Sequence, residues 1–287
     1  MRKTVLITDL DNTLFDWVEV WSQSFSAMLA VLLEQTGADP VSLKNEIQEV
    51  HKRHGTSEYA FLLEEVPTLK AFAKGEPVTE VFEEAIRSFR VARKKSLMLY
   101  PRVKETLQIL KESQVRVVAY TESMAFYTGF RIRNLELDGL IDILFSPKDH
   151  DLPEGLSPED IRRYPASYYE FRHTAHRHTP PNELKPNPQL LKDIISLIEA
   201  KPTECVYVGD SLHRDVLMAQ RAEVDHAWAK YGVAHKKPEY RLLEEVTHWD
   251  EERKEAEKRL KEVDVAPKIT LHSSFSEIRK HFKFGVL

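Results

Sequence analysis

The feature that most constrains the fold of this chain is a short apolar run, close to its start, that ends in two acids. Residues 5–8 (VLIT) are apolar or β-branched, and Asp9 and Asp11 follow them directly. Such a run is typical of a strand that is buried on both faces. Burying a carboxylate costs free energy unless it is paired, hydrogen-bonded or bound to a metal. Because ligands of open α/β sheets bind at the carboxyl ends of the strands, residues 9–11 predict an active site.

Strand and helix patterns alternate through most of the remaining chain. Short apolar runs predict further strands at 115–120, 141–145, 205–208, 225–229 and 269–271. Between these runs, apolar residues recur at helical spacing. The alternation predicts an α/β fold with a Rossmann-like, mostly parallel sheet and helices on both of its faces.

Residues 16–99 are an exception to this alternation. Their apolar residues follow helical spacing, and no convincing strand pattern occurs among them. Gly37 and Gly55 are expected to end two of the helices. Because an all-helical block directly after a strand indicates a separate lid domain, we expect an α/β core of residues 1–15 and 100–287 and a helical domain of residues 16–99.

Two segments look like additions to the core. Residues 147–184 are rich in Pro, His, Tyr, Arg and Asp and predict a long surface insertion. His173, His176 and His178 lie in it, but no cysteine or nearby acid completes a metal site. We expect a flexible basic loop there that meets an anionic substrate or another subunit. Residues 238–262 are dense in Glu, Lys and Arg and predict an exposed charged helix.

The composition restricts the class of protein. The chain has 287 residues, of which 42% are hydrophobic and 30% charged, as in ordinary globular proteins. Its formal net charge of -5 gives no support for binding to nucleic acid or to an anionic membrane. Cys205 is the one cysteine, so a disulfide within the chain is impossible. No apolar stretch approaches the length of a membrane span, and we expect a cytoplasmic protein.

Polar residues follow several of the predicted strands. They are Asp9 and Asp11 after the first strand, Thr121 after the second, Lys185 ahead of a helix, and Asp210 with Asp215 after a later strand. Acids that meet at one edge of a sheet repel each other, and a hard cation such as Mg²⁺ relieves that repulsion. Lys185 and Thr121 add a positive charge and a hydroxyl donor. Together these groups predict a site for a phosphoryl group.

At these residues the sequence resembles the haloacid dehalogenase-like (HAD) hydrolase superfamily. The four motifs of the family occur in its order, as DLDNTL at 9–14, Thr121, Lys185 in LKPNP, and GDSLHRD at 209–215. The resemblance covers residues 1–15 and about 100–232. It implies the Rossmann-like core, and it makes the helical block similar to the C1-type cap of the family. One departure is Glu223, which stands where relatives usually have glycine.

The resemblance also implies a role for each motif residue. Asp9 would attack phosphorus to form an aspartyl-phosphate, and Asp11 would protonate the leaving oxygen and then activate water. Thr121 and Lys185 would hold the phosphoryl oxygens. The metal ligands would be Asp9, the backbone carbonyl of Asp11, Asp210, and Asp215 either directly or by way of another ligand.

Three further residues are candidates for contact with the substrate, namely Trp17, Glu122 and Ser211. Trp17 shares helical spacing with Trp21 and Phe25, which favours packing inside the helical domain as its first role.

The expected function is that of a Mg²⁺-dependent phosphatase acting on a small phosphorylated metabolite. Dehalogenating relatives lack an acid at the place of Asp11, so its presence favours phosphoryl transfer. Two alternatives stay open at this point. One is a phosphomutase or phosphotransferase of the same family, and the other is a non-catalytic interaction protein that keeps the fold. The sequence leaves the substrate and the oligomeric state open.

Overall fold

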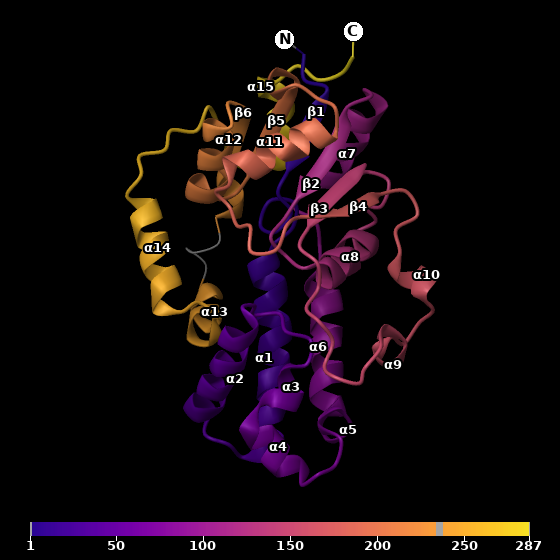
Figure 1. Ribbon diagram of the computed structural model, residues 1–287, viewed down its shortest axis with the longest axis vertical. Coiled ribbons are helices and arrows are strands. Elements are labelled where there is room, and N and C mark those ends of the chain that lie inside the picture. The colour runs from indigo at the N-terminus through magenta and orange to yellow at the C-terminus, as the bar shows by residue number, and fades with distance from the viewer. Residues whose placement is uncertain (1, 234–237, 287) are drawn as a thin grey trace. The chain divides into compact units, whose positions relative to one another are not determined.

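The structure is a computed structural model that describes residues 2–233 and 238–286 (Figure 1). The chain forms two compact units. The first, the α/β unit, comprises the described residues of Met1–Asp16, Met98–Val233 and Val265–Leu287. The second, the helical unit, comprises Trp17–Leu97 and the described residues of Ala234–Asp264.

The α/β unit is built on a parallel sheet, which within the described residues has seven strands. The strands are β1 (Val5–Thr8), β2 (Arg116–Tyr120), β3 (Ile143–Ser146), β4 (Ala175–His178), β5 (Cys205–Gly209), β6 (Asp225–Ala229) and β7 (Ile269–Leu271). Their order in the sheet is β4-β3-β2-β1-β5-β6-β7, and every neighbouring pair is parallel. The predicted α/β fold with its parallel sheet is therefore confirmed.

Strand β1 occupies the middle of this sheet, with β2 on one side and β5 on the other. Thr8 is paired with Ala119 of β2 and with Val208 of β5, so these three strands end at the same level. All four residues of β1 are buried, which explains its uninterrupted apolar composition. From β1 the chain adds β2, β3 and β4 on one side of the sheet, and then β5, β6 and β7 on the other side. The point where the chain changes sides is the place where α/β sheets bind ligands.

Helices cover the sheet. They are α7 (Val103–Glu112), α8 (Ala125–Asn134), α11 (Pro188–Leu197), α12 (Leu217–Arg221) and α15 (Ile278–His281), joined by the short turns η1 (Pro202–Glu204), η2 (Leu212–Val216), η3 (Lys230–Gly232) and η4 (Phe275–Glu277). Val5 and Ile7 pack with α11 and α12 in one apolar cluster. Leu6 points to the opposite face and is fully buried as well, so both faces of β1 are covered.

Two local sequence signals set the course of the chain in this unit. Asn187 caps α11 by accepting a hydrogen bond from the backbone N–H of Leu190 at 2.9 Å, and Pro188 begins the helix. Glu223 ends α12 with a φ of 60°, in the left-handed region that glycine adopts more easily. The turn is thus formed despite the departure from the family pattern.

The insertion at 147–184 holds regular structure. It contains α9 (Pro158–Ile161), α10 (Ala166–Tyr169) and the edge strand β4. The expectation of a flexible loop around His176 and His178 is wrong, because both residues lie in β4 and pair in register with β3. An edge strand has one neighbour and remains half in solvent, so its polar sequence gives no strand signal.

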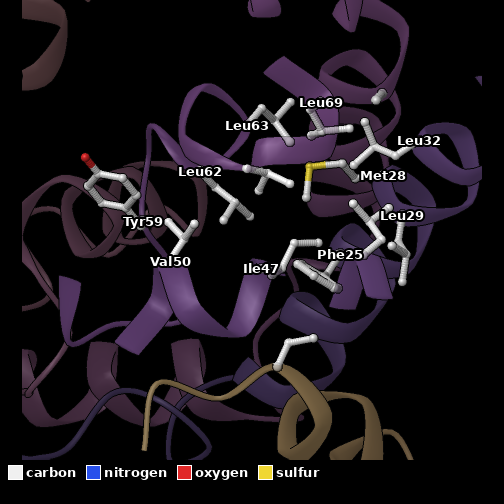
Figure 2. Packing of buried hydrophobic residues seen from close by; sticks show 14 of the residues in the cluster. Phe25, Met28, Leu29, Leu32, Ile47, Val50, Tyr59, Leu62, Leu63 and Leu69 are labelled. Carbon is white, nitrogen blue, oxygen red and sulfur yellow. The ribbon is translucent and has the colours of Figure 1, made fainter. Parts of the chain in front are cut away.

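The helical unit holds its own apolar core (Figure 2). Its helices are α1 (Trp17–Thr36), α2 (Pro40–His54), α3 (Leu62–Glu65), α4 (Pro67–Ala73), α5 (Val78–Val81), α6 (Glu83–Ser96), α13 (Tyr240–Val246) and α14 (Glu251–Lys261). Figure 2 shows side chains of α1, α2, α3 and α4 meeting in this core. Asp39 caps α2, and Gly55 ends it with a φ of 62°. Trp17 packs against the same core, beside Trp21.

Residues 238–264 belong to the helical unit, whereas the sequence pattern places them in the α/β core. The cause is a pair of apolar residues on α13, Leu243 and Val246, which are buried in the core of the helical unit. The ring of His51 on α2 is hydrogen-bonded to the carbonyl of Val246 at 2.6 Å. The highly charged α14 buries none of its residues. None of the helices in the described part of the chain is long and apolar enough to cross a membrane.

Candidate active site

Lys185 is the centre of a buried ion cluster at the carboxyl end of the sheet. Its ammonium donates to Asp9 Oδ1 at 2.6 Å, to Asp215 Oδ1 at 2.8 Å and to the carbonyl of Tyr120 at 3.2 Å. All of these groups are buried. Burial disfavours the ammonium, but the carboxylates of Asp215 and Asp9 hold the pKa of Lys185 well above its usual value. Lys185 is therefore a charged group inside the protein, which is what the predicted site for a phosphoryl group requires.

Three acids converge beside this lysine. One carboxylate oxygen from each of Asp9, Asp210 and Asp215 lies within 4.8 Å of the others. Burial, together with repulsion from Asp215 and Asp11, raises the pKa of Asp9 to about 8 against the attraction of Lys185. Burial and the same kind of repulsion raise the pKa of Asp210 well above its usual value. An all-oxygen set of crowded carboxylates fits a hard divalent cation, which would favour their ionised forms.

Asp215 is fixed in place from several directions. It accepts hydrogen bonds from the hydroxyl of Tyr207 at 2.8 Å and from the backbone N–H of Ser211 at 3.1 Å, in addition to Lys185. Gly209 lies against it, because a Cβ atom at residue 209 would be 2.3 Å from the Asp215 Cγ atom. The glycine of the GDSLHRD segment thus makes room for the acid six residues later.

Asp11 lies at the same edge and has partners of its own. Its Oδ2 atom accepts from Ser123 Oγ at 2.5 Å and from Thr121 Oγ1 at 3.4 Å. Its Oδ1 atom is 3.4 Å from Nη1 of Arg131, a buried arginine on α8. The motif residues Asp9, Asp11, Thr121, Lys185, Asp210 and Asp215 are thus brought together, and Ser123 and Arg131 join them without having been predicted.

Glu122 and Ser211 have structural partners. Glu122 Oε1 accepts from the backbone N–H of Lys185 at 2.9 Å, and its Oε2 accepts from Arg214 at 3.0 Å. Ser211 caps η2 by accepting from the backbone N–H of Arg214 at 3.3 Å. Glu122 therefore ties together the loops that carry Thr121, Lys185 and Asp210. Trp17 belongs to the helical unit, and a contact of any of these three with a substrate stays a prediction.

Two histidines of the insertion, His176 and His178, lie on the edge strand β4. His176 Nε2 is 2.8 Å from the hydroxyl of Ser146, and its ring is 4.7 Å from that of His178. Burial and the neighbouring His178 lower the pKa of His176 to about 4, so its ring is neutral at neutral pH. Among the residues that the structure describes, the group of three or more side chains arranged to hold a metal is Asp9, Asp210 and Asp215.

The fold is a Rossmann-like sheet, and its carboxyl edge holds three acids beside a buried lysine. This combination of fold and site is typical of a class of hydrolases. The sequence profile of the haloacid dehalogenase-like hydrolases matches residues 3–223. The chain belongs to this family of enzymes, as the four motifs predict.

The chain is also similar to individual proteins. The chain is 24% identical over 228 residues to a glyceraldehyde 3-phosphate phosphatase of Methanopyrus kandleri, covering 77% of this chain and 81% of the relative. A 2-haloacid dehalogenase structure from Pseudomonas syringae pv. Tomato DC3000 aligns with a TM-score of 0.53 at 18% identity, covering 98% and 97% of the two chains. A predicted phosphoglycolate phosphatase from Haemophilus somnus 129PT aligns with a TM-score of 0.51 at 16% identity, covering 98% of each chain. The two structures share the fold with this chain.

Proposed function

We propose that the protein is a Mg²⁺-dependent phosphatase that hydrolyses a small phosphate monoester through an aspartyl-phosphate on Asp9. The observation that carries the proposal is the buried contact of Lys185 with Asp9 and Asp215, next to Asp210. The presence of an acid at Asp11 supports phosphoryl transfer over dehalogenation. The relative from Methanopyrus kandleri, which is named as a phosphatase, supports the same class of reaction.

In this mechanism the phosphoryl group is transferred twice, first to Asp9 and then to water. In the first, a carboxylate oxygen of Asp9 forms a bond to phosphorus while the ester P–O bond breaks, and protonated Asp11 gives its proton to the leaving oxygen. In the second, the Asp11 carboxylate takes a proton from a water molecule whose oxygen attacks phosphorus. The bond between Asp9 and phosphorus then breaks, which releases inorganic phosphate and restores both acids.

The remaining groups position the phosphoryl group and balance its charge. Lys185 places a positive charge 2.6 Å from the attacking carboxylate of Asp9, and Thr121 offers a hydroxyl next to Asp11. Mg²⁺, held by Asp9, Asp210 and the Asp11 carbonyl with support from Asp215, would supply further positive charge for the phosphoryl oxygens. Charge neutralisation of this kind is the main requirement for attack on an anionic ester. In this proposal the helical unit is the cap domain that the family resemblance implies.

The proposal is tested by assaying the release of inorganic phosphate from p-nitrophenyl phosphate. We expect activity that disappears when Mg²⁺ is chelated, and a loss of about 10³-fold or more in Asp9→Asn, because the amide removes the nucleophile. Asp193→Asn, an exposed acid on α11, is the matched control and keeps full activity. Full activity of Asp9→Asn would show that the mechanism is wrong.

The product separates the proposal from its nearest alternative. Glyceraldehyde 3-phosphate is the first metabolite to test, because it is the substrate in the name of the Methanopyrus relative. Free phosphate in a panel of metabolite phosphates indicates a phosphatase, whereas an isomerised sugar phosphate indicates a mutase. A complete lack of turnover with Mg²⁺ present would favour an interaction protein that keeps the fold.

A further inference from the structure

Arg131 is a charged side chain in a place where a helix normally carries an apolar one. It lies in the last turn of α8 and has a relative exposure of 4%. Its guanidinium lies over the rings of Phe15 and Tyr127, at 5.9 and 6.0 Å from their centroids. Burying an arginine costs free energy unless an opposite charge and hydrogen bonds offset the loss of water. The identity of its partners therefore indicates why the residue is there.

An acidic partner of Arg131 is Asp11, at 3.4 Å between Nη1 and Oδ1. The second carboxylate oxygen of Asp11 accepts from Ser123 at 2.5 Å and from Thr121 at 3.4 Å. Each oxygen of this carboxylate thus has its own neighbour, from α8 on one side and from the loop after β2 on the other. Contacts on both oxygens fix the rotation of the carboxyl group, which a single hydrogen bond would leave free.

We propose that Arg131, together with Ser123, is a positioning residue that orients Asp11 for proton transfer to the leaving group. The inference rests on the proposed function, in which Asp11 is the general acid. A general acid must lie within hydrogen-bond reach of the atom that it protonates, so an acid that rotates freely transfers its proton less often. Arg131 acts through Asp11 in this account and does not itself contact the reacting atoms.

The neighbouring Arg133 provides a matched comparison on the same helix. Its Nη1 donates to the carbonyl of Tyr169 at 2.6 Å, and its guanidinium lies over Tyr169 and Phe171. These partners belong to the insertion and not to the ion cluster. Substituting Arg133 removes one partly buried guanidinium from α8 without touching Asp11, which separates a loss of packing from a loss of acid positioning.

The test uses the dependence of kcat/KM on the leaving group, because this parameter covers phosphoryl transfer to Asp9 but not the later hydrolysis. A nitrophenolate leaves without much help from an acid, whereas an alkoxide needs its proton. We expect Arg131→Gln to lower kcat/KM a few-fold for p-nitrophenyl phosphate and about 10²-fold for an alkyl phosphate monoester, within the usual contribution of a general acid. We expect Arg131→Lys to recover part of the kcat/KM that Arg131→Gln loses. Arg133→Gln either leaves kcat/KM unchanged or lowers it by the same factor for both substrates.

The outcome that overturns the inference is an equal loss of kcat/KM for aryl and alkyl esters in Arg131→Gln, since this is what a purely structural role predicts. A second measurement does not depend on turnover. If Arg131 and Asp11 form a pair, the decreases in thermal unfolding midpoint of Arg131→Gln and Asp11→Asn are not additive in the double variant. If the wild type hydrolyses no ester, the proposed function is wrong. If the two decreases in unfolding midpoint add up in the double variant, the pairing of Arg131 with Asp11 is wrong, whatever the activity.

Discussion

Gly209 shows how closely single residues fit around the candidate site. It ends β5, and the space where its Cβ would lie is filled by Asp215, with Cγ at 2.3 Å and Cβ at 2.5 Å. Real side chains do not approach so closely, so a larger residue at 209 must displace Asp215. Because Asp215 contacts Lys185 at 2.8 Å, the displacement would reach the lysine and through it Asp9.

We predict that Gly209→Ala lowers kcat by about 10²-fold, because a misplacement of about 1 Å is enough to disturb a reacting geometry. Overpacking of the buried site would also lower the free energy of unfolding by about 1–3 kcal/mol. The control is Gly129→Ala on α8, where the nearest neighbour is the flexible end of Arg133 at 3.0 Å. Steady-state kinetics and chemical denaturation measure the two effects. Wild-type kinetics in Gly209→Ala would show that Asp215 has room to move.

At the scale of single residues, the sequence predicts the acids of the site better than it predicts the residues that contact them. Asp9, Asp11 and Asp210 follow predicted strands of a parallel sheet, so their meeting could be predicted from the carboxyl-edge rule alone. Lys185 follows no predicted strand, and the family motif is what predicted its place. Ser123 and Arg131 could not, because a serine in a loop and an arginine in a helix are ordinary surface residues. Their contact with Asp11 depends on where α8 and the loop before it lie relative to the end of β1, which no local pattern specifies.

The turn after α12 is the element in which the chain departs from its family. Glu223 is exposed and has a φ of 60°, and the following backbone N–H, that of Val224, donates to the carbonyl of Ala219 at 2.9 Å. The hydrogen-bonded turn is retained, and a glutamate adopts a conformation that is unfavourable for residues with a Cβ atom.

We predict that Glu223→Gly raises the free energy of unfolding by about 0.5–1 kcal/mol, because relief of the left-handed strain exceeds the extra freedom of glycine in the unfolded chain. The control is Gln108→Gly, an exposed helical position on α7, where glycine costs about 1 kcal/mol. Urea denaturation compares both variants with the wild type. A decrease in stability for Glu223→Gly would mean that the turn is not strained.

The contact between α2 and α13 has a pH dependence of its own. His51 is buried, its Nδ1 is bonded to the carbonyl of Val246, and burial lowers its pKa from 6.5 to about 4. Between these two pH values the unfolded chain binds a proton at His51 that the folded chain does not bind. The stability from this group is therefore complete above pH 6.5 and is lost as the pH falls towards 4.

We predict that His51→Gln removes a pH-dependent part of the stability, on the order of 3 kcal/mol across this window. Thermal unfolding followed on both sides of the window measures the change. His281→Gln, a histidine exposed on α15, controls for the loss of one imidazole. The same dependence on pH in His51→Gln as in the wild type would contradict the assignment.

Elements were predictable where burial shaped their sequence. The buried strands β1 and β5 stand out as apolar runs. Strand β6 has the predicted bounds of 225–229, although it begins with Asp225 and His226. The edge strand β4 (AHRH) was not predictable, because a strand with one neighbour and exposed side chains needs no apolar residues. For α13, its two buried apolar residues, Leu243 and Val246, are too few to show which unit the segment joins.

At the scale of the whole molecule, the two compact units hold different groups of residues. The α/β unit holds the six motif residues and the groups that orient them, and each lies at the carboxyl edge of one sheet. The helical unit holds a separate apolar core, formed mainly by residues inserted between β1 and α7. Asp9, which is proposed to carry the phosphoryl group between the two transfers, lies in the α/β unit.

The most direct test of this claim is to identify the phosphorylated residue. The protein is mixed with p-nitrophenyl phosphate and Mg²⁺, quenched, and treated with borohydride, which reduces an aspartyl-phosphate to homoserine. We predict that mass spectrometry finds homoserine at residue 9, and that the Asp9→Asn variant shows no such product. Release of phosphate by the wild type with an unmodified Asp9, or with the label on another residue, would contradict the account.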